Sequence, residues 1–329
     1  MNFLEQFKDK KIVHISDVDF DGCICLMLGQ IYLKPIAKEF YQFGTGDRQL
    51  PDFPWDKIKN TEIVIFTDIM PYNIEMVEEL NKYVKVYYFD HHESHYKIFN
   101  NRKEVENYFY DSSICASKIF FNNLTQGIRI KKIIFQIVEM CNSYDALYDY
   151  NSPNWRSIKA LNNLVYEYIN WKIAHFQNEV EKHQPFIDTL LKKIDRANEF
   201  YFTILDKEKA LNAEKKEKKQ FEEAKKSLQI RKDTMGNIYG YFECSSKLSW
   251  IACLVLRAYP QLKYVIGHAT FLEKYRNEIN GKVSLRSLND FDVGIIAEKW
   301  KNGGHKTAAG INLELEDFYK LREGKIHLI

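Results

Sequence analysis

The sequence lacks a cysteine framework and long apolar runs. Its 329 residues include six cysteines, none in a Cys-x-x-Cys pair. This scatter predicts reduced thiols in a cytoplasmic protein, and neither a disulfide framework nor a structural zinc site. The first residues, MNFLEQFKDKK, lack the apolar core of a signal peptide, and no run of about 18 apolar residues predicts a transmembrane helix. We therefore expect no membrane association.

A strong charge of either sign is also absent. The chain has 47 basic and 45 acidic residues, which gives a formal net charge of +2. This balance does not require a nucleic-acid partner, but it allows a short anionic substrate to be held by a local basic patch. The composition, 45% hydrophobic and 28% charged, is that of a globular protein, and the length is sufficient for two domains.

Three short apolar runs in the first 90 residues each stop at an aspartate. They are KIVHISD, EIVIFTD and VKVYYFD, which end at Asp17, Asp68 and Asp90. Such runs are typical of strands buried on both faces, and the helical segment between the second and third, NIEMVEELNKY, indicates a parallel α/β sheet. Ligands of such sheets bind beyond the carboxyl ends of the strands, so we expect the three aspartates to lie together.

A different pattern occupies the second half of the chain. Residues 186–235 contain neither proline nor glycine, and their charges are nearly balanced, which predicts one long solvated helix as a linker. Beyond it, NIYGYFEC, YVIGHAT and KVSLRS predict strands, and SWIACLVLRAY and VGIIAEKW predict helices. We therefore predict an α/β protein with a parallel-sheet domain at 1–180, a helical linker at 181–229 and a smaller α/β domain at 230–329.

The segment HISDVDFDG places three carboxylates, those of Asp17, Asp19 and Asp21, two residues apart. Carboxylates this close repel one another, and cations relieve the repulsion. Further acidic and imidazole groups follow in FTDIM, FDHHES and CNSYDALYDY. Mixed carboxylate and imidazole ligands favour Mn²⁺, with Mg²⁺, Co²⁺ and Fe²⁺ as alternatives. The number of ligands is sufficient for two ions, the arrangement that serves phosphoryl chemistry.

These segments together resemble a known family. DVDFDG, TD, DHH and YDALYD follow, in order, the four motifs of the DHH phosphoesterases, and KVSLRS…NGGHKTAAG is similar to the signature of the DHH-associated substrate-binding domain. Within the family the resemblance is nearest to the bacterial nanoRNases, which cut oligoribonucleotides a few residues long. The resemblance implies a DHH catalytic domain, a linker and a substrate-binding domain with the limits given above.

Carried over by position, the resemblance implies site residues in both domains. The metal-ligand positions are Asp17, Asp19, Asp21, Asp68, His91 and Asp145. Asp90 and His92 are the expected catalytic residues: Asp90 would orient His91, and His92 would face the reacting phosphate. Many relatives carry His where this chain has Asp17, and His14 lies one residue off a spacing that several relatives use, so we expect His14 to be structural.

The second domain is expected to hold the substrate beyond the bond that is cut. Arg286 is suited to bidentate phosphate binding, and glycines allow backbone amides to approach an anion. Asn302 replaces a third glycine that the family often has. The expected substrate-binding residues are Arg286, Ser284, Gly303, Gly304 and His305.

The predicted function is two-metal hydrolysis of short oligoribonucleotides to mononucleotides, with two Mn²⁺ ions, or Mg²⁺ or Co²⁺ in their place. The alternatives are a phosphodiesterase for cyclic or linear dinucleotides, a 3′-phosphoadenosine phosphate phosphatase and, in another class, a non-catalytic nucleotide-binding regulator. The expected partners are short RNA oligonucleotides or dinucleotides. No protein partner is evident from the sequence, and a homodimer stays open.

Overall fold

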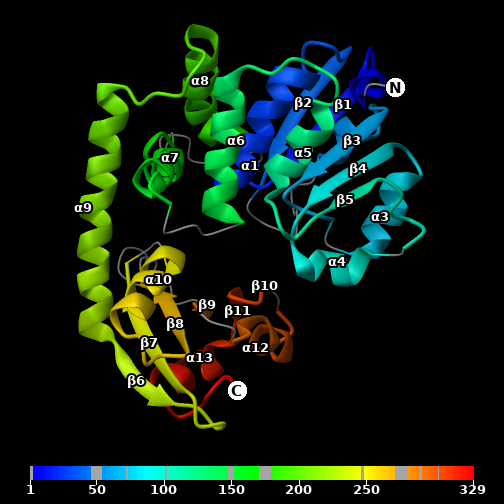
Figure 1. Cartoon of the computed structure of the whole chain (residues 1–329). Helices are drawn as coiled ribbons and strands as arrows, with labels where there is room; N and C mark the ends of the chain where they lie inside the picture. The colour runs from blue at the N-terminus through cyan, green and yellow to red at the C-terminus, as the bar shows by residue number, and fades with distance from the viewer. Residues whose placement is uncertain are drawn as a thin grey trace. The chain divides into compact units, whose positions relative to one another are not determined.

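The structure is a computed structural model that forms two compact units, Met1–Ala210 and Leu211–Ile329 (Figure 1). It describes residues 3–45, 54–71, 73–100, 102–146, 152–169, 179–245, 248–270, 281–288, 291–302 and 304–329. Each unit contains its own β-sheet, and the α/β fold class predicted from the sequence is confirmed.

The sheet of the first unit is fully parallel. Its strands are β1 (Lys11–Ser16), β2 (Glu39–Gly44), β3 (Ile63–Thr67), β4 (Lys85–Asp90) and β5 (Tyr108–Tyr110), in the order β2-β1-β3-β4-β5. The three predicted strands are confirmed as its centre, where both faces are covered. The edge strands β2 and β5 were not predicted, because their residues are mostly half-buried and form no continuous apolar run.

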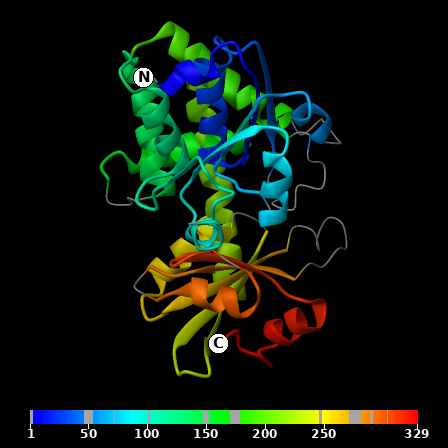
Figure 2. The same ribbon diagram turned by 90° about the vertical axis from the view of Figure 1, so that its right-hand side faces the viewer.

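Helices cover both faces of this sheet (Figure 2). One face carries η1 (Phe3–Phe7), α1 (Phe20–Leu28), which continues into the π-helix η2 (Gly29–Leu33), α5 (Ala116–Leu124), α6 (Lys132–Asp145), α7 (Trp155–Glu167) and α8 (Val180–Arg196). The other face carries α2 (Trp55–Ile58), α3 (Ile74–Asn81) and α4 (Glu93–Phe99).

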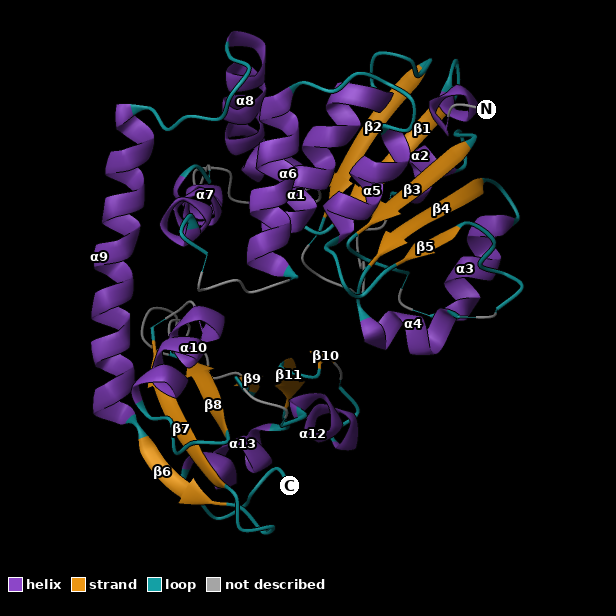
Figure 3. Cartoon of the chain, in the orientation of Figure 1, coloured by secondary structure: helices purple, strands orange, loops and turns teal. Residues whose placement is uncertain are grey.

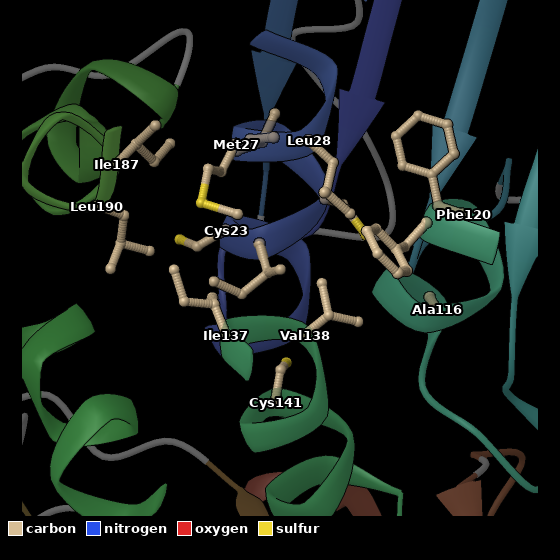
Figure 4. Close-up of a cluster of buried hydrophobic side chains, with 14 of the residues drawn as sticks. Cys23, Met27, Leu28, Ala116, Phe120, Ile137, Val138, Cys141, Ile187 and Leu190 are labelled. Carbon is tan, nitrogen blue, oxygen red and sulfur yellow. The ribbon is translucent and has the colours of Figure 1, made fainter. Parts of the chain in front are cut away.

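Helix α1 is the central element of the larger core, because all nine of its residues are buried. Figure 4 shows Cys23 and Met27 on the side of α1 toward Ile187 and Leu190 of α8, while Phe120 of α5 lies on the other side. Burying a large apolar side chain stabilises a fold by about 1.5–3 kcal/mol. Packing on several sides therefore holds the start of α1, where the acidic motif lies.

The predicted long linker helix is interrupted. Helix α8 ends at Arg196, and α9 (Ile204–Ser227) begins after a break. The break is stabilised by a capping box: the Thr203 amide donates to Asp206 Oδ2 over 2.7 Å, and the Asp206 amide donates to Thr203 Oγ1 over 3.1 Å. Lys193 Nζ lies 2.6 Å from Asp206 Oδ2 in a buried ion pair, which ties the two helices together. The boundary between the two units, at Ala210 and Leu211, falls within α9.

The second unit contains a mixed sheet (Figure 3). Its strands are β6 (Gln229–Lys232), β7 (Ile238–Cys244), β8 (Tyr264–Ala269), β9 (Lys282–Arg286), β10 (Gly304–His305) and β11 (Ala308–Asn312), in the order β10-β11-β9-β8-β7-β6. Helix α10 (Leu248–Ala258) packs on one face, while α12 (Val293–Lys299) and α13 (Leu315–Arg322) pack on the other. The predicted strands and helices of this unit are confirmed. None of the helices in the described ranges is long and apolar enough to cross a membrane.

Candidate metal and phosphate site

The carboxyl ends of β1, β3 and β4 bring the predicted acidic residues together. The three strands are neighbours, and Thr67 at the end of β3 pairs with both Ser16 of β1 and Phe89 of β4. Asp17 and Asp68 directly follow the first two strands, and Asp90 ends the third. The gathering at one sheet edge that the sequence predicts is therefore present.

The loop from Asp17 to Gly22 is folded tightly over the end of β1. Asp19 caps α1 by accepting the Gly22 amide over 3.1 Å, and Asp17 Oδ1 accepts the amides of Val18 and Asp19. A Cβ on Gly22 would lie 2.0 Å from the Asp17 carbonyl oxygen, so only glycine fits here. One ligand atom each from Asp17, Asp19 and Asp68 lies within 4.8 Å of the other two.

Asp21 is fully buried and is held from a distant part of the chain. Its Oδ2 accepts the Ala116 amide over 2.7 Å, and its Oδ1 accepts the Ser117 amide over 3.0 Å, both in the first turn of α5. The positive end of a helix stabilises a carboxylate in this position. Asp21 also forms a cluster with His91 and Asp145 whose ligand atoms lie within 4.8 Å of one another.

Asp68 is the most poorly compensated acid of the site. It is buried, its φ of 61° is rare for a non-glycine residue, and its Oδ1 has no hydrogen-bond partner among the described residues. Burial, together with the charges of Asp21 and Asp19, raises its pKa well above the usual range. A buried carboxylate oxygen without a donor is suited to a cation.

His91 lies between Asp68 and Asp145. Its Nε2 is 3.4 Å from Asp68 Oδ1 and 3.3 Å from Asp145 Oδ2. Burial alone would lower the pKa of His91, but the carboxylates of Asp145 and Asp21 raise it above its usual value. Burial also raises the pKa of Asp145 to about 8, with nearby carboxylates adding to the effect and His91 opposing it.

Asp90 contacts two imidazole rings, one of which was missed in the sequence. Its Oδ1 lies 2.7 Å from His92 Nδ1, and its Oδ2 lies 2.5 Å from His95 Nδ1. Burial raises the pKa of Asp90, but His95 and His92 outweigh it and lower that pKa well below its usual value. Asp90 Oδ1 also accepts the His91 amide over 2.9 Å. The expected role of Asp90 in orienting His91 stays a prediction, whereas the ring contacts of its carboxylate are with His92 and His95. The missed signal is in DHHESH, where His95 stands one helical turn after His92.

A buried chain of hydrogen bonds connects the strands β1, β2 and β3 beside the site. The Gln42 side-chain amide donates to His14 Nδ1, so the proton of the neutral ring lies on Nε2, which is 2.9 Å from Thr67 Oγ1. Thr67 in turn donates to Ser16 Oγ, which reaches the carbonyl of Gly22. Burial lowers the pKa of His14 to about 3, so this ring stays neutral. His14 is the structural strand residue that we expect from the sequence.

The donor set fits divalent cations that prefer oxygen and imidazole ligands. Four clusters among the described residues contain only carboxylate and imidazole groups. They are Asp68, His91 and His92; Asp90, His92 and His95; Asp21, His91 and Asp145; and Asp17, Asp19 and Asp68. Mn²⁺ and Mg²⁺ take such ligands, and their charge would offset the repulsion among these acids. The unpartnered Oδ1 of Asp68 supports the same fit.

The residues predicted in the second unit are only partly described. Arg286 ends β9, where its Nη1 donates to the Leu285 carbonyl and its Nη2 lies 2.6 Å from Ser249 Oγ. Its Nε atom is buried with no hydrogen-bond partner among the described residues. Ser284 of β9 pairs with Gly310 of β11.

The Gly-rich segment is constrained by its own hairpin. A Cβ on Gly304 would lie 2.5 Å from the Ala308 carbonyl oxygen, so the close approach of β10 and β11 requires glycine. Gly303 and the His305 side chain lie outside the described residues. The substrate-binding role of this segment stays a prediction.

Comparison with solved structures shows what this fold is like. The DHH domain of a protein from a family of ribosomal proteins matches with a TM-score of 0.63 and 12% identity, over 98% of this chain and 87% of that one. A pGpG-specific phosphodiesterase, PggH of Vibrio cholerae, matches with a TM-score of 0.52 and 14% identity, over 96% and 97%. The exonuclease RecJ bound to manganese matches with a TM-score of 0.52 and 16% identity, over 97% and 91%.

These likenesses show a shared fold at low sequence identity. No protein-family model matches the chain, and no curated protein sequence matches it. The fold is that of DHH-domain structures, as the resemblance of the motifs predicts.

Proposed function

We propose that this chain is a two-metal phosphodiesterase that hydrolyses short oligoribonucleotides to mononucleotides. The observation that carries the proposal is the crowding of buried and partly buried carboxylates and His91 at the carboxyl ends of the strands, with Asp68 Oδ1 accepting no hydrogen bond from the described residues. Crowding of this kind costs stability unless cations are bound. Perturbed acids gathered at the carboxyl ends of parallel strands are typical of active sites.

In this proposal each residue of the site has a defined role. Asp17, Asp19, Asp21, Asp68, His91 and Asp145 hold the cations, and Mn²⁺ is the first choice. Bound divalent cations supply Lewis-acid chemistry, because they lower the pKa of water and offset charge on the phosphate.

Asp90 and His92 act beside the metal ligands. Asp90 Oδ1 accepts a hydrogen bond from His92 Nδ1, which orients that ring toward the phosphate. His95 holds the other oxygen of the same carboxylate, so Asp90 cannot rotate away from His92 without losing a contact.

The second unit would supply contacts to the substrate away from the metals. Arg286 provides a guanidinium, and the segment around Gly304 provides backbone amides. We propose that they bind a phosphate or sugar of the oligonucleotide and thereby favour short substrates. The Nε atom of Arg286, which has no partner among the described residues, is consistent with a ligand at this guanidinium.

Linear dinucleotides are the second candidate substrate class. The specific observation in favour is the fold shared with a phosphodiesterase that is specific for pGpG, over nearly the full length of both chains. Cyclic dinucleotides, which contain phosphodiester bonds, and 3′-phosphoadenosine phosphate, whose 3′-phosphate is a phosphomonoester, are further alternatives for two-metal phosphoryl chemistry. A non-catalytic regulator is disfavoured, because every predicted metal-ligand position carries a ligating side chain.

Product analysis would test the function. The full chain, with Mn²⁺ and separately with Mg²⁺, is incubated with a five-residue RNA, pGpG, a cyclic dinucleotide and 3′-phosphoadenosine phosphate. We expect mononucleotides from the first two, with no turnover in the chelated protein or in folded His91→Ala. If only the cyclic dinucleotide or only 3′-phosphoadenosine phosphate is hydrolysed, that compound defines the substrate class in place of short oligoribonucleotides. Equal activity of wild type and His91→Ala would refute the metal site.

A further inference from the structure

Two tyrosines, Tyr96 and Tyr110, form a partly exposed ring stack beside the candidate site. Tyr96 belongs to α4 and Tyr110 ends β5. Their ring centroids are 4.2 Å apart and their planes differ by 19°, so the rings lie face to face. We call these two residues the tyrosine pair.

The backbone places the tyrosine pair next to Asp90. In the parallel pairing of β4 and β5, Asp90 is the register partner of Tyr110. Register partners in a sheet point to the same face, so the Tyr110 ring leaves the sheet on the side of the Asp90 carboxylate. Tyr96 directly follows His95, whose ring contacts Asp90. Two segments of the chain thus deliver the rings to one side of the Asp90–His92 contact.

Core packing does not account for the exposure of the pair. On this face Phe66, Tyr88 and Phe99 are nearly fully buried and Tyr41, Trp55 and Tyr108 are partly buried, whereas Tyr96 is 37% exposed. Tyr110 covers one face of the Tyr96 ring, which leaves the other face as the one on which a further ring could stack. An aromatic face held rigidly in solvent beside a phosphate site is suited to stacking.

We propose that Tyr96, backed by Tyr110, is a stacking platform for the nucleobase of a nucleotide whose phosphate lies at the metal and His92 site. This inference rests on the proposed function, because it takes a nucleotide as the substrate. Every nucleobase has a π face, so such a platform accepts different bases and needs no hydrogen-bond readout. Tyr110 limits the motion of the Tyr96 ring, which reduces the entropy lost on binding.

Binding by calorimetry separates the base from the phosphate. The full chain with Mn²⁺ is titrated with AMP and with ribose 5-phosphate, which lacks the base. The affinity ratio of the two ligands measures the contribution of the base. We expect a ratio of roughly 5- to 150-fold in wild type, the range of one base on one aromatic ring. Tyr96→Phe should retain this ratio, whereas Tyr96→Leu, which keeps apolar bulk without a ring, should lose most of it.

Tyr83 offers a matched control. It is also an exposed tyrosine, at 48%, but it lies just before the amino end of β4, whereas the candidate site lies at the carboxyl end. Tyr83→Ala should leave the AMP to ribose 5-phosphate ratio unchanged. The proposal is overturned if Tyr96→Leu keeps the wild-type ratio, or if wild type does not distinguish the two ligands.

Hydrolysis measured in parallel separates this inference from the proposed function. If no phosphodiester is cleaved but the base ratio falls in Tyr96→Leu, the platform stands and the proposed activity is wrong. If oligonucleotides are cleaved and the ratio is the same in Tyr96→Leu and Tyr96→Phe, the platform alone is wrong.

Discussion

Asp145→Asn should have opposite effects on the stability of the metal-free protein and on metal binding. Asp145 ends α6, and its pKa is raised to about 8 by burial and by neighbouring carboxylates. A carboxyl whose pKa is higher in the folded than in the unfolded state destabilises the fold wherever it must ionise. The resulting loss of unfolding free energy is absent below the unfolded pKa of about 4, grows as the pH rises, and is complete above pH 8.

The magnitude follows from this difference in pKa. Each pH unit between the two values corresponds to about 1.4 kcal/mol, so the cost at pH 8 is at most about 5 kcal/mol. The asparagine also removes a carboxylate that lies 3.3 Å from His91, which offsets part of the gain. We therefore expect Asp145→Asn to raise the unfolding free energy of the metal-free protein by about 1–3 kcal/mol at pH 8, and by less at pH 5.

Urea unfolding in chelator and in Mn²⁺ measures both effects. Ligand at 100 times its dissociation constant stabilises a folded protein by about 2.7 kcal/mol, so Mn²⁺ should stabilise wild type by that order and the variant much less. Asp56→Asn, an exposed acid on α2, is the matched control and should change neither quantity. A variant less stable than wild type at pH 8 without metal, or stabilised equally by Mn²⁺, would refute the account of crowded ligands.

Three further substitutions test other parts of the site. Gly22→Ala should destabilise the protein by about 1–3 kcal/mol in urea unfolding and weaken Mn²⁺ binding, because its Cβ would lie 2.0 Å from the Asp17 carbonyl; wild-type values for both would be inconsistent with the tight loop. His95→Phe should lower kcat by about 10- to 100-fold with little change in KM, and His95→Asn, which retains a donor toward Asp90, should recover part of the loss. Arg286→Lys should lower kcat/KM for two- to five-residue RNA by about 10- to 150-fold, mainly through KM, and an equal loss on a small activated phosphodiester would contradict a substrate-binding role.

The central elements could be predicted from the sequence because each is encoded locally. Runs of β-branched and aromatic residues predict β1, β3 and β4. An aspartate at or directly after the end of each strand predicts that acidic residues gather at the carboxyl ends of the strands. The break between α8 and α9 was also encoded locally, in the Thr203–Asp206 capping box, but the absence of proline and glycine outweighed it in the prediction. His95 lies outside the residues that the DHH motif names, and its spacing of one helical turn from His92 is the signal that could have identified it.

Other features depend on contacts that sequence spacing does not reveal. Asp21 is bound by amides of α5 that lie almost a hundred residues further along the chain, and Asp90 has Tyr110 as its register partner through the unpredicted strand β5. The positive φ of Asp68 and its unpartnered oxygen are likewise products of the tertiary fold. The motif predicts which side chains come together, whereas the tertiary fold determines which hydrogen bonds and charges stabilise each carboxylate.

The acids of the site differ in how many hydrogen-bond donors stabilise their carboxylates. Asp21 has an amide on each carboxylate oxygen, and Asp90 has an imidazole on each, so both are held in place without a metal. Asp68 has strained backbone and a buried oxygen without a donor among the described residues, and Asp145 has a strongly raised pKa. The repulsion that a cation would relieve is therefore concentrated at Asp68 and Asp145, and these two positions should show the largest difference in stability between metal-free and metal-bound protein. Asp21 and Asp90 act instead as preset anchors: replacing either leaves backbone amides or imidazoles without an acceptor, so we expect such variants to lose stability whether or not metal is present.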